Sequence, residues 1–326
     1  MKKFIKSQID SYDKKTYKKI DLLKKYKIHQ EIPALFLIII KNNKLIYDKT
    51  IFEGFHIYEN EGLNRKKRII NILQKMLNKY KVNDTSLIIN YADGYNWKFN
   101  MPVFNFAVPI GSQGLIFPNF DIFDFEIEGK GYNFDEMKNK IQKYYIKKDE
   151  DNDIFFRGGI TSKNKTKIRE KLVYEKIPFN VKLNQPEFIG NFKKHKYLLD
   201  LPGVKPWSVR LKYLFVMNSV VFRISFYNSK NGEKGFFQQS FDYLFKENKD
   251  YIHLIYDFDY DKEIPENIYK KIVSDIKDKY SYYENNQKEY KKVVSNMKKS
   301  SKKLNLDETL KYLYTLIETY TKKLLI

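Results

Sequence analysis

The chain has 326 residues, of which 42% are hydrophobic and 17% aromatic, so it can bury a large core and, by its length, form two domains of ordinary size. Its formal net charge is +21, contributed mostly by lysines that are spread along the chain without a basic tract. This dispersion favours solvated helix faces over a nucleic-acid site, and we expect only weak association with anionic surfaces. The absence of cysteine excludes disulfides and thiolate chemistry.

No stretch of the sequence predicts a targeting or membrane segment. The first residues lack the apolar core of a signal peptide. The longest apolar run, residues 34–40, is far shorter than the roughly 20 residues that a spanning helix needs. We therefore expect a cytoplasmic protein, bacterial or viral, without a transmembrane segment.

The beginning of the chain predicts a helix, a hairpin and a second helix. Apolar residues at helical spacing predict an amphipathic helix over residues 1–30. Residues 32–48 contain two apolar runs on either side of Asn42-Asn43, which is a hairpin signal. Residues 63–80 place their apolar side chains on one helical face.

Asp93 is the first candidate catalytic residue. It follows residues 86–90, a short apolar stretch that predicts a buried strand. In a doubly wound sheet, ligands bind beyond the carboxyl ends of the strands, which is where Asp93 would lie. The alternative is a turn aspartate, because Gly94 follows and Asp-Gly is a common turn pair.

A charge-rich segment near residue 150 indicates the end of the first domain. It follows residues 134–147, which predict a helix. We therefore expect one domain over residues 1–150 and a second over residues 151–303.

The second domain opens on a strand that ends in a glycine turn. Residues 154–156 predict a buried strand, Arg157 and Gly158 follow, and Thr161 and Ser162 precede a segment that predicts a helix. Glycine lets a ligand approach the backbone, a helix N-terminus offers N–H groups, and arginine adds charge. The pattern predicts an anion site, although such a joint is also a common tight connection.

The same order of features recurs about fifty residues later in the chain. A strand ends at Asp200, a loop with proline and glycine follows, and Pro206 suits the first turn of a helix. Ser208 and Arg210 would lie at the start of that helix, where an anion is held. Arginine occurs only six times in the chain, and its planar fork binds phosphate better than lysine does.

The last third of the chain predicts a strand followed by helices. The strand ends near Asp257 and Asp259, which could share a cation but more ordinarily cap the strand before a helix. The four histidines show no ligand spacing, so we expect no metal site. Helices interrupted near Ser300 account for the remainder.

Together these segments resemble glycosyltransferase family 90, the family of protein O-glucosyltransferases, capsule-associated xylosyltransferases and lipopolysaccharide-modifying enzymes. FFRGGITSKNKTKIR and LDLPGVKPWSVRLKYLFVMNSVVFR are similar to the family's F-R-G-x-x-T-S…R and D-x-x-G…S-x-R-x-K segments. GFFQQSF and DYIHLIY follow in the family's order. Asp93 matches the aspartate of the family's N-x-R-D-Y-P segment, where this chain has Ala92 and Gly94 as neighbours. The resemblance begins near residue 33 and is strongest over residues 154–256.

The resemblance implies an α/β, GT-B-like fold, with two facing Rossmann-like domains and the active site in the cleft between them. Residues 304–326 would form a C-terminal helix that packs back on the first domain. Asp93 would be the catalytic base. The donor-binding residues would come from both glycine-turn segments: Arg157, Gly158, Thr161, Ser162, Ser208 and Arg210.

The implied activity is metal-independent, inverting transfer of a sugar from a UDP-sugar to a hydroxyl of a glycan or glycoprotein. Glucose and xylose are the expected sugars, and no cofactor is expected besides the donor substrate. The alternative is a non-catalytic, basic polyanion-binding or scaffold protein on the same fold.

Overall fold

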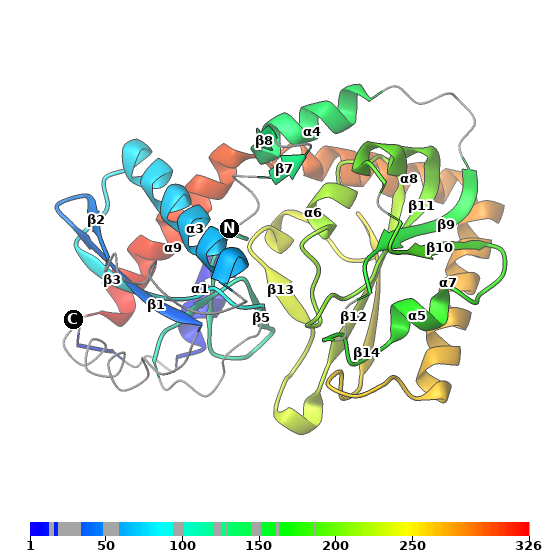
Figure 1. The fold of residues 1–326 in the computed structure, drawn as a ribbon, viewed down its shortest axis with the longest axis horizontal. Helices are drawn as coiled ribbons and strands as arrows, with labels where there is room; N and C mark the ends of the chain where they lie inside the picture. Colours follow the sequence, from blue (N-terminus) through cyan, green and yellow to red (C-terminus); the bar gives the residue numbers. More distant parts are fainter. Residues whose placement is uncertain are drawn as a thin grey trace. The chain divides into compact units, whose positions relative to one another are not determined.

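The computed structural model describes residues 1–12, 16–18, 34–47, 59–93, 101–119, 125–127, 130–144, 151–160, 163–185 and 187–325. The chain divides into two compact units (Figure 1). The first unit contains residues 1–134, 238–243 and 305–326, and the second contains residues 135–237 and 244–304. The segment near residue 150, where the sequence placed a boundary, lies inside the second unit.

A mixed five-stranded sheet forms the centre of the first unit. Its strands are β1 (Leu35–Lys41), β2 (Lys44–Ile46), β3 (Thr85–Asn90), β4 (Phe104–Asn105) and β6 (Leu115–Ile116), in the order β2-β1-β3-β4-β6. β1 is antiparallel to β2 and β3, whereas β3, β4 and β6 are parallel. Three short strands lie outside this sheet: β5 (Ala107–Pro109), β7 (Phe125–Ile127) and β8 (Lys130–Tyr132).

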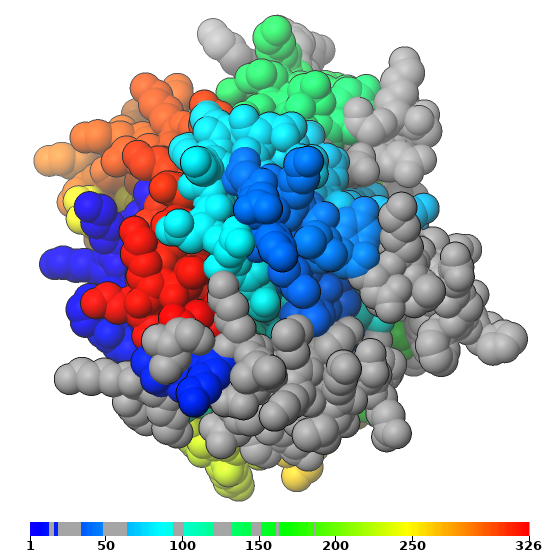
Figure 2. Space-filling view, turned by 90° about the vertical axis from the view of Figure 1, so that its left-hand side faces the viewer, coloured from blue at the N-terminus to red at the C-terminus, as the bar shows by residue number. Residues whose placement is uncertain are grey.

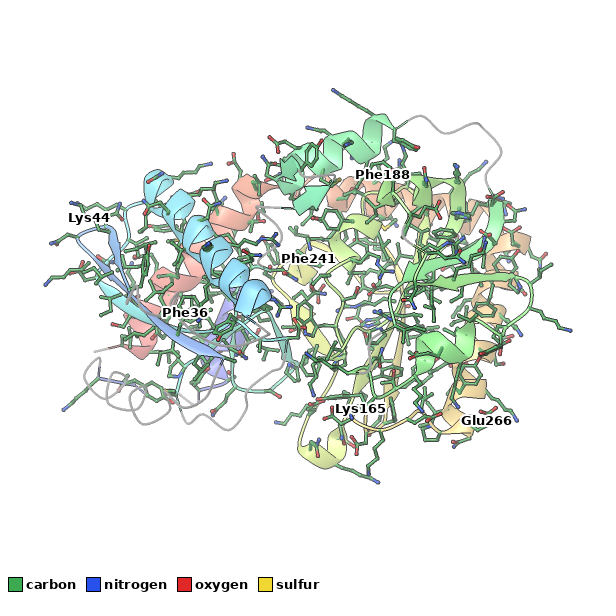
Figure 3. The ribbon with its side chains drawn as sticks, viewed as in Figure 1. Phe36, Lys44, Lys165, Phe188, Phe241 and Glu266 are labelled. Carbon is green, nitrogen blue, oxygen red and sulfur yellow. The ribbon has the colours of Figure 1, made fainter. Side chains whose placement is uncertain are left out.

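The hairpin predicted around Asn42 and Asn43 is confirmed. Both asparagines have positive φ angles, 51° and 58°, the combination that a type I′ turn requires. Lys41 pairs with Lys44 directly across the turn. Lys44 is exposed at the end of the hairpin, whereas Phe36 is fully buried (Figure 3).

The described residues of the first unit form the helices α1 (Lys2–Asp10), α3 (Glu59–Lys79) and α9 (Leu306–Leu324). α9 contacts both of the others, and Figure 2 shows it in red between α1 in blue and α3 in cyan. Its apolar face is buried through Leu310, Leu313, Leu316 and Ile317, as the spacing of these residues predicts. The Tyr320 hydroxyl also donates a hydrogen bond of 2.9 Å to the Ser86 carbonyl of β3.

The N-terminal helix is shorter than the sequence predicts. It ends at Asp10, a turn at Ser11 and Tyr12 follows, and Tyr17 donates its backbone N–H to the Leu324 carbonyl at 2.7 Å. The chain therefore leaves the helical conformation to pair with the end of α9. Most of the remaining expected helix, residues 13–15 and 19–30, lies outside the described residues.

The second unit contains an entirely parallel sheet. Its strands are β9 (Asp151–Gly158), β10 (Phe179–Leu183), β11 (His195–Asp200), β12 (Val220–Tyr227) and β14 (Ile252–Asp257), in the order β10-β9-β11-β12-β14. This order, with helices between the strands, places the chain in the Rossmann-like α/β class. The prediction of that class is confirmed.

The helices of the second unit are α4 (Phe134–Lys143), α5 (Ile168–Leu172), α6 (Leu211–Leu214), α7 (Glu266–Asn285) and α8 (Gln287–Ser301). α7 packs against β14 and α8 against β12. α8 ends at Ser301, close to the interruption predicted at Ser300. The 3₁₀ turns at residues 189–194 and 229–231 also belong to this unit. Most of the short strand β13 (Phe237–Gln239), which pairs with β5, and most of the 3₁₀ turn at residues 242–244 belong to the first unit. None of the described helices has both the length and the apolar character required to cross a bilayer.

Replacing a buried leucine of α9 should destabilise the first unit. Leu313 is 0% exposed, so Leu313→Ala leaves a cavity and should lower the free energy of unfolding by about 2–5 kcal/mol. Lys311→Ala, on the exposed face of the same helix, is the matched control and should change it by less than about 0.5 kcal/mol. Urea unfolding followed by circular dichroism measures both, and equal effects would contradict the packing of α9.

Candidate functional site

The candidate site lies where β9 and β11 end. β9 has β10 on one side and β11 on the other, so the chain changes direction across the sheet at β9. In open α/β sheets, ligands bind at such a switch point, outside the carboxyl ends of the strands. Both sequence segments that predict an anion site follow these two strands.

Two arginines hold the turn after β9. The Arg210 Nη1 donates a hydrogen bond to the carbonyl of Arg157, and the Arg169 Nη1 donates one of 3.0 Å to the carbonyl of Gly159. The guanidinium groups lie over the ring of Phe156, at 4.7 Å for Arg210 and 5.4 Å for Arg169. Two positive charges are therefore brought to one backbone turn.

Arg169 also joins this turn to the next one. Its Nη2 donates a hydrogen bond of 3.2 Å to the carbonyl of Leu201, directly after β11. Arg169 is 7% exposed and comes from α5, so a single buried side chain connects the ends of two strands and a helix. The arginine fixes the spacing of the two turns.

Glycine is required at Gly158 because of the close packing around the turn. A Cβ atom there would lie 2.8 Å from the Phe156 ring and 3.1 Å from the Arg210 Nη2. The Phe156 ring is buried and cannot easily move away. At Gly203 a Cβ atom would lie 3.4 Å from the Trp207 carbonyl, a close but ordinary contact.

Asp200 is the buried carboxylate of the cluster. It ends β11, is 3% exposed, and accepts a hydrogen bond from Ser208, while its Oδ1 has no hydrogen-bond partner. Burial raises the pKa of Asp200 to about 6, and the charges of Arg223, Arg210 and Arg169 oppose that rise. Burial also lowers the pKa of Arg210 to about 10, assisted by the charge of Arg169 and opposed by Asp200.

Ser208 connects this carboxylate to Arg210. Its Oγ accepts a hydrogen bond of 3.3 Å from the backbone N–H of Arg210. Ser208 and Arg210 are therefore brought together with Gly158, as the sequence predicts. Arg169, Asp200 and Arg223 join the same cluster, although the sequence did not mark them as ligand-binding residues.

The Arg157 side chain lies elsewhere. Arg157 and Phe156 are neighbours in an extended strand, so their side chains point to opposite faces. The Arg157 guanidinium lies 4.0 Å from the Phe155 ring, donates to the carbonyls of Phe156 and Asn180, and forms an ion pair with Glu187 at 3.3 Å. Only the backbone carbonyl of Arg157 contacts Arg210.

The helices expected directly after the two turns begin later and are short, which corrects the prediction of two helix N-termini at the site. α5 begins at Ile168 and has five residues, and α6 begins at Leu211 and has four. The Asn164 side chain holds the backbone N–H of Thr166 in a turn, and Lys167 has a positive φ of 51°. Charge at this site comes from side chains, not from helix dipoles. Thr161 and Ser162 lie outside the described residues.

Asp93 belongs to the first unit and lies beyond the carboxyl end of β3. Arg65 of α3 donates from its Nη1 to the Asp93 Oδ1 at 2.8 Å and to the Tyr91 carbonyl at 3.2 Å. The Asp93 side chain is 34% exposed and that of Arg65 is 12% exposed. Asp93 is therefore an accessible carboxylate that a partly buried arginine holds in place.

Asp257 and Asp259 have separate hydrogen-bonding roles. Asp257 accepts hydrogen bonds from Ser229, including one of 3.0 Å from its backbone N–H, and Asp259 accepts one of 3.2 Å from the backbone N–H of Asp261. The described residues contain no group of three or more histidine or acidic side chains that could hold a metal ion. Asp257 thus links the end of β14 to the segment after β12, whereas Asp259 acts in a local turn.

No protein-family model matches the chain, and no curated protein matches it.

The residues that sequence reasoning missed act over long distances in the chain. Arg169 bonds to the carbonyl of Leu201, which is 32 residues away, and no local pattern records such a contact. The available signal was the scarcity of arginine, since Arg169 and Arg223 are two of only six in the sequence. The strand register also places Arg223 beside Asp200, so an accurate sheet prediction would have paired them.

The raised pKa of Asp200 makes stability depend on pH. Because the folded pKa is near 6 and the ordinary value is 3.8, the protonated form stabilises the fold below about pH 4, and this contribution is lost as pH rises through 6. Asp200→Asn mimics the protonated form. It should match the wild type near pH 4 and be more stable by up to about 3 kcal/mol near pH 8. Chemical denaturation of both proteins across this pH range measures their difference in stability. A difference that does not change with pH would contradict the prediction.

Proposed function

We propose that this protein is an inverting glycosyltransferase that moves a sugar from a UDP-sugar to a hydroxyl of a glycan or glycoprotein. The observation that carries the proposal is the convergence of Arg210 and Arg169 on the glycine turn at the switch point of the parallel sheet. Such a turn, with charged donors beside it, suits a diphosphate. The sequence resemblance to glycosyltransferase family 90 supplies the type of reaction.

In this proposal Arg210 and Ser208 bind the donor diphosphate, and Gly158 allows Phe156 and Arg210 to pack closely against the turn. Thr161 and Ser162 add hydroxyl donors, as the resemblance implies. The guanidinium of Arg157 is already engaged by two carbonyls and by Glu187. We therefore assign to the Arg157 side chain the packing of the opposite face of β9 against β10, and no contact with the phosphates.

Asp93 is the proposed general base. Its carboxylate accepts the proton of the acceptor hydroxyl while that oxygen attacks the anomeric carbon, and the bond from that carbon to the diphosphate breaks. The attack comes from the face opposite the leaving group, so the configuration inverts. The ion pair with Arg65 orients the carboxylate.

The leaving diphosphate gains negative charge in the transition state. Arginine side chains fixed by hydrogen bonds to backbone carbonyls can stabilise this charge without reorganising during the reaction. The remaining features of the proposal come from the resemblance: a GT-B arrangement of the two units, glucose or xylose as the sugar, and independence of metal.

Binding of UDP is the first test of the proposed donor site. UDP should raise the melting temperature of the protein without added metal, and EDTA should not abolish the rise. Arg210→Ala removes a charge-assisted contact worth about 1.5–3 kcal/mol and should remove most of the shift. Thermal unfolding with and without millimolar UDP measures both.

Arg157→Ala is the matched control, because it removes an arginine from the same turn on the other face of β9. It should lower the melting temperature of the free protein but retain the UDP shift. If UDP shifts neither the wild type nor the control, the donor site is wrong. If DNA or heparin binds instead, with a steep dependence on salt, the polyanion-binding alternative is favoured.

Asp93→Asn tests the base. Asparagine keeps the size and an acceptor oxygen for Arg65 but cannot take a proton. Turnover of a UDP-sugar should fall by roughly 10²–10⁴-fold while UDP binding is unchanged. Release of UDP in the presence of a panel of sugar donors and acceptors measures this.

Asp84→Asn is the control for this variant. Asp84 also belongs to the first unit, where it accepts the Asn42 N–H at 2.8 Å before β3 begins, and its replacement should leave turnover unchanged. An Asp93→Asn enzyme with full activity would exclude Asp93 as the base and leave the donor site untouched.

A further inference from the structure

Asp200 is the buried carboxylate of the arginine cluster. It interacts electrostatically with Arg169, Arg210 and Arg223, and the three guanidinium groups come from α5, the segment before α6, and β12. Glu170 also acts on Arg169, and Glu247 acts on Arg223. Asp200 acts on all three arginines, so its charge bears directly on the affinity of the cluster for an anion.

The carboxylate is also connected to the backbone of the proposed phosphate-binding segment. Ser208 donates its hydroxyl hydrogen to Asp200 and accepts the backbone N–H of Arg210 at 3.3 Å. Asp200 therefore fixes Ser208, and Ser208 fixes the start of the turn that carries Arg210. The Asp200 Oδ1 remains without a hydrogen-bond partner, so a proton added there would displace no existing hydrogen bond.

An anion in this cluster and the Asp200 carboxylate have the same sign of charge, and like charges disfavour each other's ionised form. A bound anion therefore favours a protonated Asp200, and by linkage a protonated Asp200 favours the bound anion. We infer that Asp200 is a positioning residue of the anion site and takes up one proton from solvent when the site binds a diphosphate. This inference rests on the proposed function, because it concerns the same site.

The other groups around Asp200 keep their charge over the relevant pH range. Arg169 and Arg223 remain cationic, as does Arg210, whose pKa is near 10. His253 lies beyond Arg223, and burial lowers the pKa of His253 to about 4, so this side chain is neutral. The hydrogen bond to His253 lowers the pKa of its neighbour Glu247. Burial raises the pKa of Asp200 to about 6, within reach of neutral pH. Asp200 can therefore change its charge when an anion binds to the cluster.

The experiment is calorimetric titration of the full chain with UDP-glucose, whose diphosphate is a diester and does not titrate near neutral pH. Wild-type affinity should fall by up to about tenfold per pH unit above about pH 6. Titrations in two buffers of different ionisation enthalpy should record uptake of up to one proton. In Asp200→Asn the affinity should change by less than about twofold over the same range, with no proton uptake, and near pH 8 it should exceed the wild-type affinity by up to about a hundredfold.

Ser208→Ala separates the charge of Asp200 from its contact with Ser208. It should bind UDP-glucose more weakly at every pH but keep the wild-type pH dependence, because the carboxylate is still present. A pH-independent wild-type affinity without proton uptake would overturn the inference and leave the proposed function standing. Persistence of the pH dependence in Asp200→Asn, or weaker binding by that variant near pH 8, would also overturn it. Absence of UDP-glucose binding at every pH would overturn the proposed function and this inference together.

Discussion

The second unit depends on hydrogen bonds from buried arginines to backbone carbonyls at the ends of its strands. Arg169 links the carbonyls of Gly159 and Leu201, and Arg210 holds the carbonyl of Arg157. Parallel strands end in loops whose carbonyls have lost their ladder partners, and a buried carbonyl without a partner is costly. Arginine supplies several donors in a fixed plane, so one side chain can satisfy two strand ends. The rigid turn that results is what a phosphate-binding site needs.

The sequence predicts the sheets and long helices well because their signals are local. The apolar runs before Gly158 and Asp200 form β9 and β11, and the residues on either side of Asn42-Asn43 form a hairpin. The periodic apolar residues of α3 and α9 are sufficient to predict both helices. In each case the pattern that buries apolar side chains also sets the backbone conformation.

The short segments after the turns could not be predicted in the same way. The lysine-rich stretch from residue 163 has helical periodicity, but the Asn164 side chain takes the Thr166 N–H and α5 begins only at Ile168. After β11, the backbone N–H of Trp207 donates a hydrogen bond of 2.7 Å to the Lys205 carbonyl, which holds a tight turn where a helix was expected. Side-chain hydrogen bonds and close turns compete with helix formation, and helical propensity alone does not show which one forms. The structure therefore brings Ser208, Arg210 and Gly158 together at the strand ends, whereas the helices expected to supply charge there begin later in the chain.

The path of the chain through the two units has a consequence for how the protein is made. The first unit is assembled from three separated segments, the last of which is residues 305–326. A ribosome therefore completes the whole second unit before it releases the helix that packs between α1 and α3. Until then the apolar surfaces that contact α9, and the Ser86 carbonyl that accepts the Tyr320 hydroxyl, have no cover from that helix. The nascent first unit therefore lacks the cover of α9 until residues 305–326 have been synthesised, and a chain without that segment would keep these apolar surfaces uncovered by α9.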